Sequence, residues 1–267
     1  MFDPAAFLKK LNRCAVMGIV NITGDSFSEK EFSAPESAVS RALALFEDGA
    51  DLLDLGAEST RPGSEAVSAD EECRRLLPVL QELRRRLPQL PLSVDTRNGE
   101  TAELALQYGA DIINDVSMGR SERLLKAVAE KKAGLVLCHS RGTPQDMLSE
   151  KYTSYPNGVR QETERELEDA RQKAVSLGVS SDFIWLDPGI GFAKTAAQCS
   201  TLVAEAALLN RRSPWLWGIS RKSFMGGSVE SRGPRTLELE LQLIAAGASV
   251  IRTHDVRALC QAMKERG

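Results

Sequence analysis

Short runs of apolar residues that end abruptly in polar residues recur along the whole chain. Leu52, Leu53 and Leu55, for example, run directly into the polar stretch 57–63. Short apolar runs bounded by turn residues are typical of buried strands. The pattern predicts eight strands, over residues 15–22, 52–55, 91–96, 111–116, 134–138, 183–186 and 215–219, with the last beginning at 249–251.

Segments with apolar residues at helical spacing lie between these strands. Helices are predicted over 4–11, from a capping pattern at Ser33 and Glu36 to Gly49, from Ser68 to 87, in a segment that ends at Gly109, and over 121–132, 159–177, 235–246 and 257–264. A glycine precedes a strand at Gly49, Gly109 and Gly247, as at many helix ends. This alternation predicts an α/β protein, a (β/α)8 TIM barrel that forms a single domain over residues 1–267.

Composition and charge narrow the functional classes. The 34 basic and 37 acidic residues give a net charge of −3, which argues against a nucleic-acid or anionic-membrane surface. Five scattered cysteines without a Cys-x-x-Cys pair argue against a disulfide framework and a zinc site. The chain shows no signal-peptide pattern, and no apolar run approaches about 18 residues. We therefore expect a cytoplasmic protein.

Every predicted strand leads into side chains that form strong hydrogen bonds. These are Asn21, Thr60 with Arg61, Asp95, Asn114, His139, Asp187, Lys222, and Arg252 with His254. A parallel barrel brings the carboxyl ends of its strands onto one face. Strand-end Asp and Asn residues often only satisfy the backbone of the next turn. Because all the ends are polar, a functional site explains the pattern better than a series of separate turns.

Two sets of these residues suit different parts of a ligand. Arg252 and His254 are two positions apart in a strand, so their side chains share a face, and with Arg61 or Lys222 they would suit a phosphate or diphosphate. The alternative is structural, with Arg252 paired to a core carboxylate and His254 a packed imidazole. The second set suits the donor and acceptor edge of a heterocycle and comprises Asp95, Asn114 and Asp187.

Other kinds of site fit the sequence poorly. Cys138 and His139 are adjacent in a strand and face opposite ways, so they do not form a catalytic dyad. Two histidines in the chain are too few for a three-His metal site, and there is no Gly-x4-Gly-Lys-Ser/Thr loop. If a metal takes part, we expect Mg2+ held by Asn21, waters and a substrate phosphate.

Several sequence blocks resemble the dihydropteroate synthase family of folate biosynthesis, which sulfonamides inhibit. The blocks are MGIVNIT (17–23), DSFS (25–28), ESTRPG (58–63), SVDT (93–96), NDVS (114–117), DPGIGF (187–192), SRKS (220–223) and RTHDV (252–256). The resemblance implies a transferase that joins 6-hydroxymethyl-7,8-dihydropterin diphosphate to para-aminobenzoate, giving 7,8-dihydropteroate and diphosphate. It also implies Mg2+ as cofactor, sulfonamides as competitors of para-aminobenzoate, and a homodimer.

The resemblance further implies a role for each matching residue. The pterin-binding set is Asp95, Asn114, Asp187 and Lys222. The diphosphate set is Asn21, Thr60, Arg61, Arg252 and His254, with Asn21 also touching Mg2+. The para-aminobenzoate set is Phe27, Thr60, Pro62, Phe192 and Ser223. The residues expected to take part in catalysis are Asn21, Asp95, Lys222, Arg252 and His254.

The first loop departs from the family pattern. Gly24 stands where the family usually has proline, and Glu29 where it usually has aspartate. These changes allow a different sulfonamide affinity, in a direction that the sequence does not give. Two alternative functions stay open: a pterin-dependent methyltransferase, which would have no use for a diphosphate site, and a non-catalytic pterin-binding paralogue, which the changed loop would suit.

Overall fold

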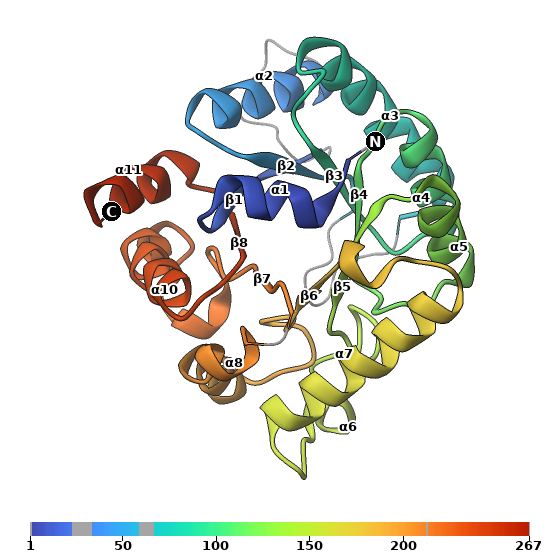
Figure 1. Cartoon of the computed structure of the whole chain (residues 1–267). Coiled ribbons are helices and arrows are strands. Elements are labelled where there is room, and N and C mark those ends of the chain that lie inside the picture. The colour runs from blue at the N-terminus through green and yellow to red at the C-terminus, as the bar shows by residue number, and fades with distance from the viewer. Residues whose placement is uncertain (1, 23–33, 59–66, 212, 267) are drawn as a thin grey trace.

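The computed structural model describes residues 2–22, 34–58, 67–211 and 213–266, in which helices surround a cylinder of strands (Figure 1). The strands are β1 (Ala15–Asn21), β2 (Leu52–Gly56), β3 (Leu92–Thr96), β4 (Ile112–Asp115), β5 (Gly134–Cys138), β6 (Ile184–Asp187), β7 (Leu216–Trp217) and β8 (Val250–Thr253). The helices are α1 (Pro4–Leu11), α2 (Ala34–Glu47), α3 (Ala69–Arg86), α4 (Gly99–Gln107), α5 (Glu122–Lys131), α6 (Glu150–Thr153), α7 (Val159–Ser176), α8 (Ala196–Ala204), α9 (Ala206–Leu209), α10 (Gly233–Ala245) and α11 (Val256–Arg266). Short 3-10 helices are η1 (Ser181–Phe183), η2 (Ser223–Met225) and η3 (Glu230–Arg232).

All the strand pairs are parallel, in the order β6-β5-β4-β3-β2-β1-β8-β7. The seam between the two ends of this sheet is bridged just before β7. There Leu186 pairs in parallel with Trp215, and the Leu186 N–H donates to the carbonyl oxygen of Pro214 at 3.0 Å. The result is a nearly closed barrel of eight parallel strands in a single α/β domain, so the predicted fold class is confirmed.

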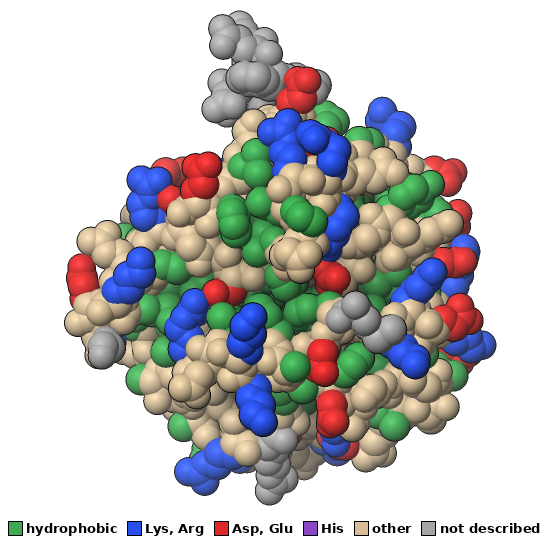
Figure 2. All heavy atoms as spheres, turned by 45° about the horizontal axis from the view of Figure 1, so that its top comes forward, with side chains coloured by type: hydrophobic (Ala, Val, Ile, Leu, Met, Phe, Trp, Pro, Cys, Tyr) green, Lys and Arg blue, Asp and Glu red, His purple; other side chains and the backbone are tan. Residues whose placement is uncertain are grey.

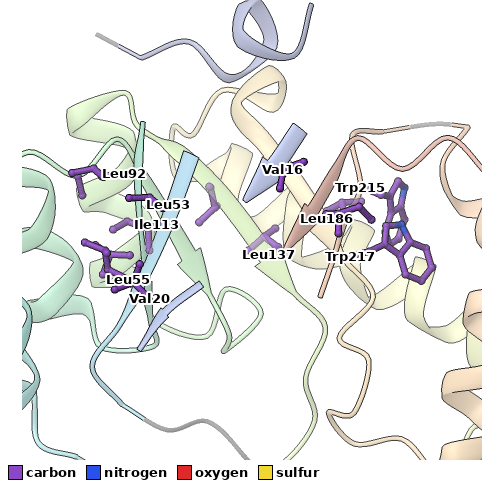
Figure 3. Close-up of a cluster of buried hydrophobic side chains, with 14 of the residues drawn as sticks. Val16, Val20, Leu53, Leu55, Leu92, Ile113, Leu137, Leu186, Trp215 and Trp217 are labelled. Carbon is purple, nitrogen blue, oxygen red and sulfur yellow. The ribbon is translucent and has the colours of Figure 1, made fainter. Parts of the chain in front are cut away.

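The outward faces of the strands form the main hydrophobic core. Val16, Leu53, Ile113 and Leu137 are fully buried there, between the barrel and its helices (Figure 3). Trp217 on β7 is also fully buried, and its Nε1 donates to Oδ1 of Asn210 at 3.1 Å. Strands covered by helices are apolar on this face because they contact no water.

The inward faces change from apolar to polar along the barrel axis. The first layer inside the barrel is an apolar cluster of Ala15, Met17, Leu52, Ile112, Val136, Trp185, Leu216 and Val250. Two positions further along the strands, the same inward face carries Asp54, Asn114, Cys138, Asp187 and Arg252. Side chains two apart in a strand point the same way. The polar residues therefore line the barrel near the carboxyl ends of its strands.

Helix α1 covers the opposite end of the barrel and lies across its middle in Figure 1. Phe2, Phe7, Leu8 and Leu11 pack against the apolar inner layer. The Phe7 ring lies 6.5 Å from that of Trp185, measured between centroids. Asp3 begins the helix by accepting the Ala6 N–H at 2.9 Å, and Pro4 follows it. Among the described residues, apolar side chains therefore fill this end of the barrel, and the polar layer lies toward the other end.

Most predicted elements are present, with differences near β7. Strand β7 spans only Leu216–Trp217 instead of 215–219, because Trp215 makes only an isolated bridge. Helix α8 was not predicted, although Thr195 and Gln198 form a capping box in which the Gln198 N–H donates to Oγ1 of Thr195 at 3.3 Å. The predicted cap at Ser68 is confirmed by a 3.3 Å bond from the Glu71 N–H, and Ser121 caps α5 in the same way by accepting the Leu124 N–H at 3.3 Å. The proposed cap at Ser33 lies outside the described residues.

The surface and the cysteines fit the composition. Basic and acidic side chains are interspersed over the face shown in Figure 2. All five cysteines are free in this structure. Within the described ranges, every helix is too short or too polar to span a lipid bilayer.

Candidate active site

The guanidinium of Arg252 lies inside the barrel between two carboxylates. Its Nε donates to Oδ2 of Asp54 at 2.6 Å, and its Nη2 donates to Oδ2 of Asp95 at 2.8 Å. Asn114 donates its Nδ2 to the same Asp54 oxygen at 3.0 Å. The pairing of Arg252 with core carboxylates, considered as a structural alternative, is therefore present. Because these carboxylates belong to the polar layer, the pairing also orients Arg252 within the site.

Three oxygen atoms of this cluster are buried and accept no hydrogen bond from the described part of the chain. They are Oδ1 of Asp54, Oδ1 of Asp95 and Oδ1 of Asn114. Buried polar atoms nearly always have partners in folded proteins. A ligand with several N–H groups would supply the missing donors. The cluster thus fits the amino and ring N–H groups of a heterocycle.

Asp95 titrates far from its ordinary range. Burial raises its pKa from 3.8 to about 7, against the opposing effect of Arg252, and the neighbouring Asp54 carboxylate raises it further. One guanidinium shared by two buried carboxylates does not fully compensate both. Near neutral pH, Asp95 can therefore exist in either protonation state.

Asp187 and Lys222 line another part of the barrel interior. Asp187 ends β6, where its Oδ1 accepts the Gly189 N–H at 2.7 Å. Lys222 donates from Nζ to the carbonyl oxygen of Ile190 and lies over the Phe192 ring, 4.9 Å from its centroid. Burial lowers the pKa of Lys222, and the Asp187 carboxylate opposes this shift. Burial raises the pKa of Asp187, and Lys222 opposes it.

Gly218, just after β7, shows that the two groups of side chains face one another. A Cβ atom added at Gly218 would lie 3.7 Å from Cδ of Arg252 and 3.9 Å from Oδ2 of Asp187. Both side chains therefore border the same space at the barrel end. The predicted pterin-binding residues, on β3, β4, β6 and after β7, thus line one inner surface.

The remaining predicted residues lie at the rim or outside the described ranges. The His254 N–H donates to Oγ of Ser220 at 3.2 Å, and its Nδ1 lies 3.0 Å from the same oxygen. Asn21 is exposed at the end of β1, and Ser223 is exposed at the start of η2. Phe27, Thr60, Arg61 and Pro62 lie outside the described residues.

Two side chains differ from the sequence interpretation. The sequence analysis assigned Asp54 no role, and the structure makes it the shared acceptor for Arg252 and Asn114. Its position two residues after the inward-facing Leu52 was the sequence signal that Asp54 also faces the barrel interior. His139 was expected to join the site, but its ring is fully buried against Glu166 of α7 and Lys194. It immediately follows Cys138, which faces inward, so the alternation turns His139 away.

Asn21 offers an amide oxygen, a type of ligand that Mg2+ accepts. In the described ranges, no three His, Cys, Asp or Glu side chains are grouped so that they could hold a metal ion. Mg2+ commonly keeps several waters and binds through few protein oxygens together with substrate phosphates. An exposed amide oxygen at the rim fits that mode of binding. Asn21 would hold the ion on the protein side.

Known proteins show the same sequence pattern and fold. The family described as "Pterin binding enzyme" matches residues 17–254. A dihydropteroate synthase from Synechocystis is 41% identical over 261 residues, which cover 94% of this chain and 89% of that protein. The structure of a Xanthomonas albilineans dihydropteroate synthase with 4-aminobenzoic acid has a TM-score of 0.89 and 38% identity, covering 96% of this chain and 93% of that chain. A Yersinia pestis dihydropteroate synthase with a sulfonamide drug complex has a TM-score of 0.87 and 32% identity, covering 96% and 94%.

The chain therefore belongs to the family of pterin-binding enzymes. Within that family it belongs to the dihydropteroate synthases, which are transferases of folate biosynthesis. The resemblance seen in the sequence blocks is confirmed, and the match extends over nearly the whole barrel. Membership in this class favours the synthase over a methyltransferase or a non-catalytic paralogue.

Proposed function

We propose that the protein joins 6-hydroxymethyl-7,8-dihydropterin diphosphate to para-aminobenzoate, giving 7,8-dihydropteroate and diphosphate. The observation that carries the proposal is the set of buried acceptor oxygens of Asp54, Asp95 and Asn114 that have no donor among the described residues. A pterin has amino and ring N–H groups on one edge, and these would satisfy such acceptors. Family membership supports the same assignment.

The pterin would lie inside the barrel between the polar side chains. Asp95 and Asn114 would accept its N–H groups, while Asp187 and Lys222 would contact it from the other side. Lys222, whose ammonium already lies near the Phe192 ring, would donate to an acceptor atom of the ring system. The apolar layer and α1 close the barrel below, so the reactive methyl group would face the open rim.

The diphosphate would lie at this rim. Arg252 and His254, two positions apart at the end of β8, would neutralise charge on the leaving group together with Arg61 and Thr60. Asp54 and Asp95 hold Arg252 in one orientation, which reduces the reorganisation needed during reaction. A Mg2+ ion held by Asn21 would add further positive charge at this position.

Bond cleavage can then precede attack by the second substrate. As negative charge grows on the diphosphate, positive charge grows on the pterin methylene, and an ionised Asp95 would stabilise it. Para-aminobenzoate already carries a neutral amine at pH 7, so its nitrogen can attack without a dedicated general base. Phe192, Ser223, Phe27 and Pro62 would form the pocket for this substrate.

The direct test is a turnover assay with the purified protein. Diphosphate release and dihydropteroate formation should both require para-aminobenzoate and Mg2+. Arg252→Ala should abolish turnover and leave much of the pterin affinity in a calorimetric titration. Pterin binding without turnover in the unmodified protein would refute the synthase and favour the non-catalytic paralogue.

Sulfonamides are proposed as competitors of para-aminobenzoate, as the drug complex of the Yersinia pestis relative suggests. A sulfonamide titration in the turnover assay measures the inhibition constant at several para-aminobenzoate concentrations. The departures Gly24 and Glu29 that motivate an altered affinity lie outside the described residues. An unchanged affinity relative to a family member would remove that part of the proposal.

A homodimer and a cytoplasmic location complete the proposal. A groove of about 310 Å3 between α8 and α10 is lined by Val203, Phe224, Met225 and Leu239 together with Ser200, Arg235 and Gln242, and it is a candidate surface for pairing through the later helices. Sedimentation would show the mass of one chain or two.

The free cysteines support a reducing compartment, which fractionation of cells would test. Neither nucleic acid nor a membrane is an expected partner.

A further inference from the structure

A buried lysine holds the loop that follows β6. Lys194 is 3% exposed. Its Nζ lies 3.3 Å from the carbonyl oxygen of Gly189, 3.1 Å from that of Phe192 and 2.8 Å from Nδ1 of His139. An ammonium carries three N–H donors, so these three acceptors use all of them. Burial of a lysine is costly, and here its direct hydrogen-bond partners are loop carbonyls and an imidazole.

His139 connects this lysine to α7. Because its Nδ1 accepts from Lys194, the ring proton is assigned to Nε2, which donates to Oε2 of Glu166 at 3.2 Å. Burial lowers the pKa of His139 to about 3, which agrees with a neutral ring. Glu166 also accepts from Nε of Arg141 at 3.0 Å. A continuous chain of hydrogen bonds therefore runs from the loop to the outer helix.

Other side chains hold the same loop from different directions. The Tyr155 hydroxyl donates to the carbonyl oxygen of Ala193 at 3.0 Å. Lys222 donates to the carbonyl oxygen of Ile190. With the two bonds from Lys194, the carbonyls of Gly189, Ile190, Phe192 and Ala193 all accept from side chains. The loop conformation thus depends on these side chains as well as on its own backbone.

We propose that Lys194 is a positioning residue that fixes this loop so that Phe192 stays at the wall of the para-aminobenzoate pocket. The inference rests on the proposed function, because Phe192 has that role only in the proposed site. Lys194 points away from the barrel interior toward His139, so it acts through Phe192 and not by touching substrate. Removing its amine would take this donor from the Phe192 carbonyl and leave the Gly189 carbonyl with the Phe192 N–H at 3.0 Å, so that the ring could move. The affinity for para-aminobenzoate would then fall, while the rate of the chemical step would change less.

The test compares Lys194→Met with a matched variant, Lys173→Met. Lys173 on α7 also donates from Nζ to a backbone carbonyl, that of Gly119 at 2.7 Å. Gly119 belongs to a different loop from the one that Lys194 holds. Hydrogen exchange of the peptide covering 188–194 is measured alongside steady-state kinetics. K194M should speed exchange in that peptide and raise KM for para-aminobenzoate about tenfold, with kcat changed less than about threefold. K173M should leave both measurements close to those of the unmodified protein.

Several results would overturn the inference. These are unchanged exchange in K194M, faster exchange with unchanged KM, or equal changes in both variants, which would indicate a general loss of stability. If K194M does not fold, Lys194→Gln, which keeps an amide donor and lacks the charge, takes its place. If the unmodified protein shows no turnover, the proposed function fails on its own, and a calorimetric titration of para-aminobenzoate replaces KM.

Discussion

Nε of Arg252 donates to Oδ2 of Asp54 at 2.6 Å, although the two residues are 198 positions apart in the chain. The same oxygen accepts from Nδ2 of Asn114 at 3.0 Å. Asp54 is fully buried. One carboxylate on β2 therefore orients a residue proposed to bind diphosphate and a residue proposed to bind the pterin.

Replacing Asp54 with alanine would remove this shared acceptor. D54A would remove the buried hydrogen bonds from Arg252 and Asn114 while Arg252 keeps its bond to Asp95, so it should lower the free energy of unfolding by about 2 kcal/mol. The loss of orientation should lower kcat/KM about a hundredfold. Urea titrations and steady-state assays measure the two effects.

The control for D54A is Asp169→Ala. Asp169 lies 3.7 Å from Arg165 on α7, and the side chains of this pair are 65% and 63% exposed. Exposed pairs contribute about 0.5 kcal/mol. If D54A were no less stable than D169A, the proposed positioning role of Asp54 would be wrong.

Asp95→Asn should change how stability depends on pH. The pKa of Asp95 is raised from 3.8 to about 7 in the folded protein, mainly by burial. Between these values the unfolded chain loses a proton that the folded protein keeps, so the free energy of unfolding falls as pH rises. Asparagine does not titrate, so the D95N curve should lack that fall. Urea titrations between about pH 4 and pH 7.5 measure it, and parallel curves for both proteins would contradict the assignment.

Gly189→Ala should be severely destabilising. Gly189 has φ +65°, and an added Cβ would lie 2.0 Å from the carbonyl oxygen of His139. Gly119→Ala separates the cost of backbone strain from the cost of the steric contact. Gly119 has a similar φ of +72°, but the nearest atoms would lie 3.7 Å or more from its added Cβ. We expect about 1 kcal/mol of destabilisation for G119A from backbone strain and at least about 3 kcal/mol for G189A, measured by urea titration. Similar losses would show that the contact with His139 relaxes at little cost.

The sequence was sufficient to predict the barrel because its signals are local. Apolar strands, helix caps and glycines such as Gly49 act within a few residues. The two-residue period of a strand, which puts Leu52 and Asp54 on one face, indicates which side chains face inward. The polar residues Asp95, Asn114, Asp187 and Arg252 could be predicted as one group for the same reason. Helix α8 was missed although its capping box was present at Thr195.

The pairings inside the site could not be predicted in this way. Whether Arg252 contacts Asp54, Asp95 or a ligand depends on how strands far apart in sequence meet across the barrel. His139 was placed wrongly because it was grouped with the other strand-end residues, although alternation with the inward-facing Cys138 turns it away from the barrel interior. The buried partners Lys194 and Glu166 come from a loop and an outer helix, so spacing along the chain gives no indication of their contact.

Asn21→Ala should weaken the binding of Mg2+. Asn21 is exposed at the end of β1, and an amide oxygen there would be one of few protein ligands to the ion. We expect the Mg2+ concentration for half-maximal turnover to rise about tenfold, with a smaller change in kcat at saturating Mg2+. Calorimetric titration of Mg2+ in the presence of diphosphate gives a second measurement that does not depend on turnover. Asn157→Ala, at an exposed position before α7, is the matched control. EDTA should stop turnover in the unmodified protein, and an unchanged Mg2+ requirement in N21A would remove Asn21 from the metal site.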